Sequence, residues 1–310
     1  MNTLPTTSTR PLRALELFCG IGGFAAALPP NVEVTAAIDL GSHVLSVYRH
    51  NFPEHNALQQ NLEYLSEEEL GSYEADIWWM SPPCQPYTTR GKERDLQDRR
   101  ARSLIHLLAL IEELRPAMIG MENVEGFLGS EAWELVLRTL KIQGYEIHEE
   151  VLCPTELGIP ARRRRYYLVA SLHGLRSPNE MDFSRQTLKE FLDPEPAEEL
   201  FVPEEIVATH GPGMRIIDLE KTPYRIANTF TGAYGKTWQA AGSYLQTPGG
   251  RVRRFSPKEL LRLLGFPEAF QFPQGYSRRL TYKAIGNSLS VVVMRRVLSR
   301  LLIPPPVETQ

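Results

Sequence analysis

Cys84 is the residue of this chain whose neighbours best suit covalent chemistry. It lies in the stretch SPPCQP (81–86), directly after the apolar run IWWM (77–80). A thiolate is a strong nucleophile, although a free thiol, with a pKa of about 8.5, is only partly ionised at neutral pH. The neighbouring prolines restrict the backbone and would hold the sulfur in place. Because a buried, inert cysteine fits poorly with a polar loop rich in proline, we predict that Cys84 is a nucleophile.

A carboxyl group, that of Glu122, also follows an apolar run, PAMIGM (116–121). If both runs are strands of one parallel sheet, Glu122 and Cys84 lie at its carboxyl edge, where such sheets bind ligands. Partly apolar surroundings raise the pKa of a carboxyl group and favour a role in proton donation. The residues leave two other roles open for Glu122, that of a helix cap and that of an ion-pair partner.

A glycine turn, CGIGG (19–23), follows the apolar run ALELF (14–18), and Asp39 ends the next apolar run, VEVTAAID (32–39). Glycines permit a sharp turn close to a ligand, and an acid about 20 residues later is placed to accept hydrogen bonds from ribose hydroxyls. The turn lacks the GxGxxG spacing of dinucleotide sites, which favours a nucleoside cofactor without pyrophosphate. The alternative for Asp39 is the N-cap of the following helix.

The elements that must position these side chains alternate between short apolar runs, which indicate strands, and segments of helical periodicity. The predicted strands are 14–18, 32–39, 75–80, 117–121, 146–152 and 166–171. The predicted helices are 25–28 (AAAL), 42–50, 101–114, 131–142, 256–265 and 290–302. Strands and helices in this order predict an α/β fold with a doubly wound, Rossmann-like sheet and a second, smaller domain.

Loss of regular periodicity after residue 172 divides the chain further. We expect a flexible tail at 1–12, a catalytic domain at 13–172, a small recognition domain at 173–254, a return segment at 255–303 that completes the catalytic domain, and a tail at 304–310.

Composition narrows the class of protein. With 310 residues and 42% hydrophobic composition, the chain can form a substantial core. Its apolar runs are too short to span a bilayer and its start lacks a secretory signal, so we expect a cytoplasmic protein. Its three cysteines show no zinc spacing, and we expect no metal. A net charge of −3 means that any contact with a polyanion must be local, at basic clusters such as 162–165 and 251–254.

Seven motifs resemble, in order and spacing, the cytosine-C5 methyltransferase family over roughly residues 13–302. They are FCGIGG, AAID, SPPCQP, MENVEGF, GIPARRRRYYLVA, RRFSPKELLRLLGFP and IGNSLSV. The resemblance implies a methyltransferase whose catalytic domain binds S-adenosyl-L-methionine. It also implies that Cys84 adds to C6 of cytosine, that Glu122 protonates or hydrogen-bonds N3, and that Arg163 and Arg165 help to hold the base.

The resemblance assigns two further sets of residues. The predicted cofactor residues are Phe18, Gly20, Ile21, Gly22, Gly23, Asp39, Asn61, Leu62, Pro82, Asn287 and Ser288. The predicted substrate residues are Gln85, Asn123, Thr229, Phe230 and Thr231. Asn61 departs from the pattern, because many relatives have an acid at that position.

Within the family, the chain looks most like the branch that methylates transfer RNA, best known for the anticodon loop of aspartate tRNA. The stretch TFTGAYGKTWQAAGSYLQT (229–247) carries part of this likeness, with Thr229 where that branch usually has cysteine. A short recognition region argues against wrapping a duplex, and a cytosine in an unpaired loop needs less energy to expose. We predict a monomeric tRNA cytosine-C5 methyltransferase. The alternative is a DNA cytosine-C5 methyltransferase, as in a restriction–modification system, and a non-catalytic nucleic-acid-binding relative is disfavoured because Cys84, Glu122 and Arg165 are all present.

Overall fold

The computed structural model describes residues 10–87, 95–178, 184–221 and 225–302. The chain forms two compact units, which are described separately. Unit 1 comprises Met1–Leu152, Arg164–Glu180 and Met294–Gln310, and unit 2 comprises Cys153–Arg163 and Met181–Val293. The predicted tails lie largely outside the described residues.

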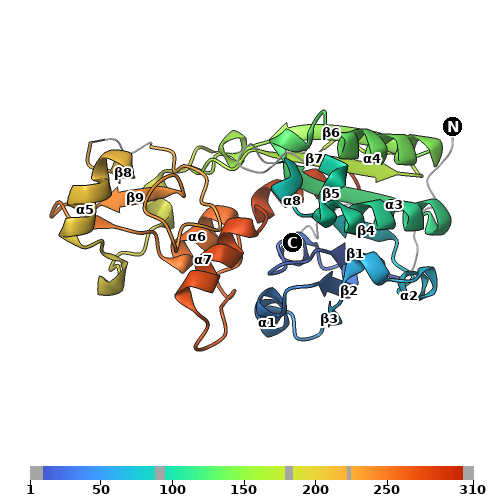
Figure 1. The fold of residues 1–310 in the computed structure, drawn as a ribbon, viewed down its shortest axis with the longest axis horizontal. Helices are drawn as coiled ribbons and strands as arrows, with labels where there is room; N and C mark the ends of the chain where they lie inside the picture. The colour runs from blue at the N-terminus through green and yellow to red at the C-terminus, as the bar shows by residue number, and fades with distance from the viewer. Residues whose placement is uncertain (1–9, 88–94, 179–183, 222–224, 303–310) are drawn as a thin grey trace, which may run out of the picture. The chain divides into compact units, whose positions relative to one another are not determined.

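Unit 1 is built on a seven-stranded sheet with the order β3-β2-β1-β4-β5-β7-β6 (Figure 1). Its strands are β1 Leu12–Leu17, β2 Val32–Asp39, β3 Ala57–Gln59, β4 Ile77–Met80, β5 Met118–Val124, β6 Glu146–Leu152 and β7 Arg165–Ser171. Strands β1 to β5 are parallel, whereas β7 is antiparallel to both of its neighbours. The strand order reverses between β1 and β4, so their carboxyl ends meet at the point where doubly wound sheets bind ligands. The predicted fold class is confirmed.

Helices cover the sheet of unit 1. Their apolar residues recur at helical spacing and so form one face of each helix, which is buried against the core. These helices are α1 Ser42–Asn51, α2 Glu67–Ser72, α3 Arg102–Leu114 and α4 Glu131–Ile142. Helix α3 buries Leu104, Leu107, Leu108 and Ile111 in the same core as α2, α4 and one face of the sheet. Each such leucine stabilises the fold by about 2 kcal/mol. Helix α1 packs in a separate cluster with β2, and α8 (Val291–Leu298) lies near the C-terminus.

The predicted helix at 25–28 is wrong. Residues Ala25–Ala27 form a single 3-10 turn, because Pro29 and Pro30 follow at once and prolines do not continue a helix. The chain therefore passes from β1 to β2 through a compact turn, with no α-helix between them.

The described residues of unit 2 combine a small sheet with helices. Its strands, in the order β10-β9-β8, are β8 Arg215–Asp218, β9 Ser243–Gln246 and β10 Val252–Arg253. Its helices are α5 Glu204–His210, α6 Pro257–Leu264 and α7 Arg278–Asn287. Buried aromatic rings form much of its core, with centroids 5.0 to 5.6 Å apart, from Phe230, Tyr234, Tyr244, Phe255 and Tyr282. Helices α6 and α7 thus group with unit 2, and the predicted return of 255–303 to the catalytic domain stays a prediction.

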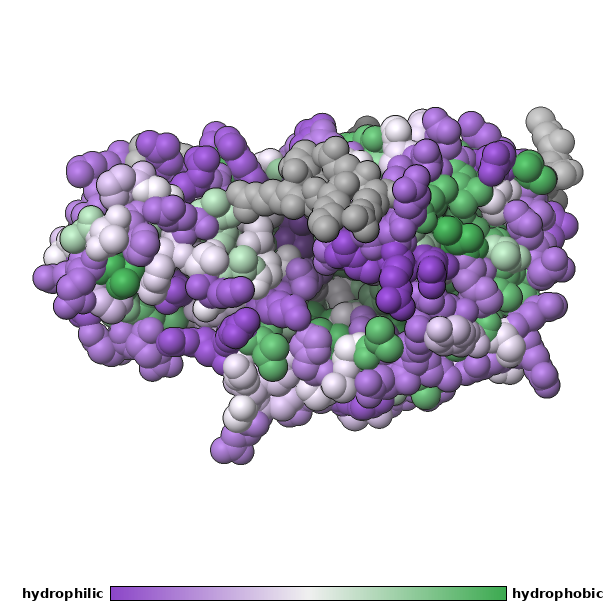
Figure 2. Space-filling view, viewed as in Figure 1, coloured by the Kyte–Doolittle hydropathy of each residue, from purple (hydrophilic) through white to green (hydrophobic). Residues whose placement is uncertain are grey.

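Hydrophilic residues cover most of the face drawn in Figure 2. Within the described ranges, no helix has the length and apolar character that crossing a membrane requires.

Candidate active site

The loop that carries Cys84 is held at the carboxyl ends of β1 and β4 by backbone contacts. The amide of Ser81 donates to the carbonyl of Leu17 at 3.2 Å, and the amide of Tyr87 donates to the carbonyl of Cys84 at 3.0 Å. The far end of the loop passes so close to Gly126 that a Cβ there would lie 2.4 Å from the Tyr87 carbonyl oxygen. The half-buried Cys84 thiol forms no disulfide, and these backbone contacts hold its loop at the sheet edge.

Strand β5 brings Glu122 and Asn123 to the same edge. Asn123 is fully buried, and its Nδ2 donates to the carbonyl of Pro82 across 3.5 Å, a long bond that ties β5 to the Cys84 loop. Glu122 forms an ion pair with Arg165 of β7, with Oε1 and Nε 3.2 Å apart and both side chains more than four-fifths buried. Within unit 1, the structure thus places three of the predicted catalytic residues at one edge of the sheet, namely Cys84, Glu122 and Arg165. It also shows Glu122 as an ion-pair partner, one of the alternatives that the sequence left open.

Arg100 is a cation that interacts with Cys84 and was not predicted from the sequence. The pKa of Arg100 is raised, chiefly by its side-chain hydrogen bonds to Asp98, at 2.9 and 2.6 Å, and further by the negative charge of Cys84. Arg100 therefore places a positive charge that interacts electrostatically with Cys84. No motif marks Arg100, which lies in the arginine-rich turn after the loop.

The glycine turn after β1 is shaped by Asp39. The Asp39 carboxylate accepts the amide of Gly20 at 2.9 Å through Oδ2 and the amide of Gly41 at 2.7 Å through Oδ1. The N-cap of α1 is Gly41, so the alternative that Asp39 is the N-cap is wrong. Phe18 has a φ of 58°, a strained value for a non-glycine residue that is typical of functional sites.

Two glycines of this turn meet different surroundings. Gly22 has a φ of 87°, and a Cβ there would lie 2.5 Å from the ring of Phe52, so this position accepts only glycine. Gly20 has open space within 4 Å of the position of a Cβ, which leaves its backbone accessible to a ligand. Ile21 and Gly23 are buried and support the turn from within.

The other predicted cofactor and substrate residues of unit 1 have structural contacts. Asn61 caps the 3-10 turn at 62–64, its Oδ1 accepting the amide of Glu63 at 3.1 Å. Leu62 is buried in the core and Pro82 is buried in the Cys84 loop, whereas Gln85 is exposed. Their roles toward ligands stay predictions.

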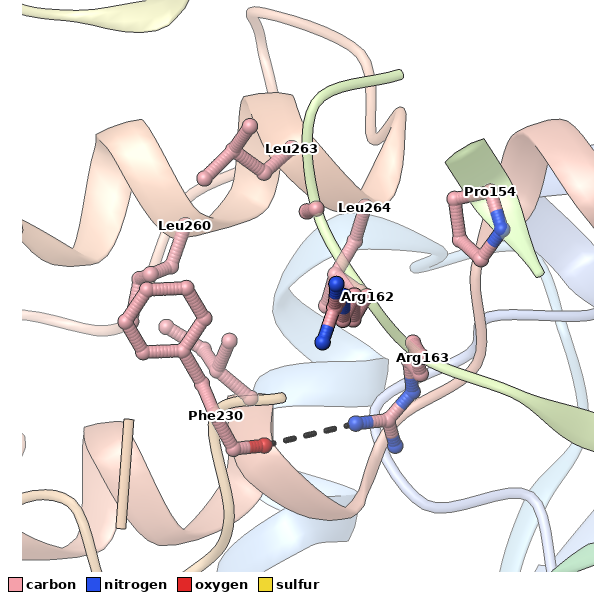
Figure 3. Close-up of a pocket in the computed structure, with 9 residues that line it drawn as sticks. Pro154, Arg162, Arg163, Phe230, Leu260, Leu263 and Leu264 are labelled. Carbon is pink, nitrogen blue, oxygen red and sulfur yellow. Dashed lines mark hydrogen bonds between the residues drawn. The ribbon is translucent and has the colours of Figure 1, made fainter. Parts of the chain in front are cut away.

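Arg163 lies in unit 2 and is almost fully buried (Figure 3). Its guanidinium donates to the carbonyls of Phe230 at 3.4 Å, Gly286 at 3.1 Å and Ser288. Two backbone segments, one at Phe230 and one at 286–288, therefore meet at this one side chain. These bonds occupy its terminal nitrogens with backbone carbonyls, and the predicted role of Arg163 in holding the base stays a prediction.

The remaining predicted residues also lie in unit 2. Thr229 donates through its hydroxyl to the carbonyl of Arg162 at 2.9 Å, and the amide of Thr231 donates to a carbonyl at 2.9 Å. The Phe230 ring is buried and faces an apolar pocket lined by leucines of α6 (Figure 3). Asn287 is exposed at the end of α7, and Ser288 is its buried C-cap. Among the residues that the structure describes, no three His, Cys, Asp or Glu side chains are grouped so as to hold a metal ion.

A buried carboxyl group lies directly beneath the glycine turn. Glu16 of β1 accepts the Tyr48 hydroxyl at 3.0 Å, and that hydroxyl is also 3.1 Å from His55 Nδ1. Burial raises the pKa of Glu16 to about 8, although hydrogen bonds from Tyr48 and from the amides of Phe24 and Ala25 lower it in part.

This raised pKa predicts that the free energy of unfolding falls as the pH rises. Unfolded Glu16 loses its proton near pH 4.5, whereas folded Glu16 keeps it up to about pH 8. Between those values the folded state binds more protons, so stability decreases and levels off above pH 8. Burial lowers the pKa of His55, which gives the opposite slope but only below pH 6.5. Between pH 6.5 and 8 we expect a loss of about 2 kcal/mol that Glu16→Gln abolishes, measured by urea denaturation of both proteins. Equal losses in the two proteins would contradict the assignment.

Comparison with known proteins finds methyltransferases by family model, by sequence and by structure. The family model described as C-5 cytosine-specific DNA methylase matches residues 12–239 and 222–302. The tRNA (cytosine(38)-C(5))-methyltransferase of Rattus norvegicus is 29% identical, with 94% of this chain and 99% of the relative covered. The DNA (cytosine-5)-methyltransferase of Dictyostelium discoideum is 28% identical, with 94% and 95% covered. Among solved structures, the Entamoeba histolytica methyltransferase EhMeth has a TM-score of 0.86 at 26% identity, covering 93% of this chain and 97% of that chain.

Proposed function

Since this chain belongs to the C-5 cytosine-specific DNA methylase family, we propose that it methylates C5 of a cytosine in transfer RNA. One observation carries the proposal. The Cys84 loop is tied through Pro82 to Asn123, and the adjacent Glu122 is paired with Arg165 at 3.2 Å. A nucleophile, a carboxyl group and a cation therefore lie at one edge of a sheet.

S-adenosyl-L-methionine is the proposed methyl donor, and unit 1 offers residues that suit it. A carboxylate suits the ribose hydroxyls, and the remaining lone pairs of the Asp39 oxygens can accept them. Gly20 leaves room for a ligand beside the turn, and Phe18 ends β1 at the same place. When bound, this group supplies the methyl as an electrophilic sulfonium substituent. Asn287 and Ser288 stay predicted cofactor residues, as the family resemblance implies.

The chemistry performed by the chain begins with the Cys84 thiolate, whose electron pair forms a bond to C6 of the cytosine. The ring electrons of the C5–C6 double bond are displaced toward N3, which takes a proton from Glu122, and C5 becomes an enamine-like nucleophile. After methylation a base removes the C5 proton, N3 returns its proton to Glu122, and the C6–S bond breaks with its electrons on sulfur. Covalent addition thereby divides one difficult step into easier ones.

Arg165 and Arg163 support this chemistry in different ways. Arg165 holds the Glu122 carboxyl group in place and offers positive charge where the ring becomes electron-rich, as preorganised dipoles and cations do in active sites. Arg163 is a positioning residue, because it fixes the carbonyls of Phe230, Gly286 and Ser288. Gln85 in unit 1 and Thr229 and Thr231 in unit 2 are proposed to contact the nucleic acid. The buried Asn123 is proposed to act on the substrate indirectly, by holding the Cys84 loop through Pro82.

Two observations favour tRNA over DNA. The relative from Rattus norvegicus, whose name specifies cytosine 38 of tRNA, aligns with 94% of this chain. The chain has a net charge of −3, and a loop cytosine needs less energy to expose than one in a duplex. We therefore propose an anticodon-loop cytosine of an aspartate-type tRNA. DNA methylation is the second candidate, because the Dictyostelium discoideum relative is named for it.

A labelling assay separates the two substrates. The full-length protein is incubated with S-adenosylmethionine carrying a tritiated methyl group and with unfractionated tRNA or genomic DNA, with Cys84→Ala as the blank. We expect label in tRNA that ribonuclease releases, and bisulfite sequencing should place it at one anticodon-loop cytosine. Label in DNA with none in tRNA would refute the proposal and favour the second candidate.

A further inference from the structure

Three arginines of the stretch RVRR (251–254) differ in how their charges are balanced. Arg251 forms an ion pair with Glu198, and Arg253 is buried against Glu259 in a two-pronged pair with both bonds at 2.8 Å. Among the described residues, Arg254 has no carboxylate within ion-pair distance, and its Nε has no hydrogen-bond partner. Arg254 therefore carries the one uncompensated charge of this cluster.

Arg254 is nevertheless held in a defined place. Its guanidinium carbon lies 3.7 Å from the centroid of the Trp238 ring, a close cation–π contact. Trp238 in turn packs near the buried Tyr244 of β9, with ring centroids 6.3 Å apart. Both Arg254 and Trp238 are partly exposed, so the pair lies at the surface of unit 2.

The loop that presents Trp238 is closed and anchored. The amide of Thr231 donates to the carbonyl of Ala241 at 2.9 Å and joins the two ends of the loop. Inside it, Tyr234 is fully buried and its hydroxyl donates to the carbonyl of Ser243 at 2.7 Å. The exposed Lys236 lies on the same loop. Because the loop begins at the stretch 229–231, which is proposed to contact nucleic acid, Trp238 and Arg254 continue that surface.

We propose that Arg254, oriented by Trp238, binds a phosphate of the RNA backbone. A guanidinium stacked on an aromatic ring keeps its N–H groups in its own plane, in the fork that matches two phosphate oxygens. The Nε of Arg254 is buried, so the two terminal nitrogens of this partly exposed side chain are the proposed donors. Stacking also restricts the side chain before binding, so less conformational freedom is lost when the phosphate arrives. This inference rests on the proposed tRNA substrate and adds a backbone contact distant in sequence from the catalytic residues.

Arg251 provides a matched control. It lies three residues earlier, and its guanidinium carbon is 3.8 Å from the centroid of the Phe201 ring, so its cation–π geometry is nearly the same. Its charge, however, is balanced by Glu198. If an uncompensated charge is what binds phosphate, substitution of Arg254 should weaken RNA binding, and the same substitution of Arg251 should not.

The test measures binding of an aspartate tRNA transcript to the full-length protein between 50 and 200 mM salt. We expect Arg254→Gln to weaken binding about tenfold at low salt and to reduce the slope of log K against log salt by about 0.7 to 0.9, the value of one lost phosphate contact. Arg251→Gln should leave both quantities unchanged. Arg254→Lys, which retains the charge without the fork, should retain the slope with weaker affinity, and it provides the test if the glutamine variant does not fold.

The outcomes separate this inference from the proposed function. If the unaltered protein labels tRNA but the slopes for Arg254→Gln and Arg251→Gln agree, the phosphate contact is refuted and the function stands. Weaker binding of Arg254→Gln with an unchanged slope would refute it too, because it would indicate a contact with a base. Label in DNA alone would overturn both the tRNA function and this inference.

Discussion

Cys84→Ala is expected to lower kcat by about four to six orders of magnitude, because it removes the nucleophile on which every later step depends. Binding of S-adenosylmethionine should change by no more than about twofold, since the proposed cofactor residues Asp39 and Gly20 lie on other strands and turns and the substitution leaves Pro82 of the same loop in place. Turnover is measured by methyl transfer to tRNA and cofactor binding by calorimetry. The loop itself should persist, because its fixed points are backbone groups of Ser81 and Tyr87.

The other cysteines provide the control for this experiment. Cys153 is buried in unit 2, where its sulfur accepts the amide of Arg163 at 3.4 Å. Cys153→Ser should therefore retain turnover within about tenfold, as a conservative change to a weak hydrogen bond would allow. Equal activity of Cys84→Ala and Cys153→Ser would show that sulfur at position 84 is not needed for the reaction.

Glu259→Ala is expected to destabilise unit 2 by about 3 to 5 kcal/mol, because it leaves the Arg253 guanidinium buried without its counter-charge. Both side chains of this pair are at least 96% buried. Glu259 also accepts the amides of Ser256 at 2.7 Å and Asp193 at 2.9 Å, so its loss also removes part of the cap of α6. Urea denaturation followed by intrinsic fluorescence measures the loss.

Glu268→Ala is the matched control for this substitution. Glu268 lies just beyond α6 and pairs with Arg262 at 2.7 Å, but its side chain is more than half exposed. Exposed pairs contribute about 0 to 1 kcal/mol, so the control should be far milder. A loss for Glu259→Ala no larger than that for Glu268→Ala would contradict a structural role for the buried pair.

The sequence predicted the part of the fold that hydrophobic patterning determines. Buried runs such as 77–80 and 117–121 are apolar at every position, as strands covered on both faces must be, and the structure has β4 and β5 there. Patterning does not specify strand direction, so the antiparallel placement of β7 was not predicted. Helix α7 was also missed, because its sequence, RRLTYKAIGN, is mostly polar and ends in glycine and asparagine.

The candidate site was predictable where chemistry depends on residue type and less so where it depends on packing. Cys84 and Glu122 were found because each follows an apolar run of the sequence that predicts a strand. In the arginine run 162–165 the roles depend on packing instead. Arg162 and Arg164 are exposed, whereas Arg163 between them is buried. Consecutive side chains of an extended segment point in opposite directions, and sequence alone does not show which direction faces the core. Arg100 was missed for a similar reason, since only folding brings its turn near Cys84.

The central claim is a transient bond between the sulfur of Cys84 and C6 of the target cytosine. A tRNA transcript containing 5-fluorocytosine tests it directly, because fluorine cannot leave C5 as a proton does and the adduct is then trapped after methylation. The protein is incubated with this tRNA and S-adenosylmethionine, digested, and analysed by mass spectrometry. The account predicts a methylated fluorocytidine nucleotide on the peptide that contains Cys84 and none on those with Cys19 or Cys153. Methylation of ordinary tRNA by a protein that forms no adduct at Cys84 would contradict it.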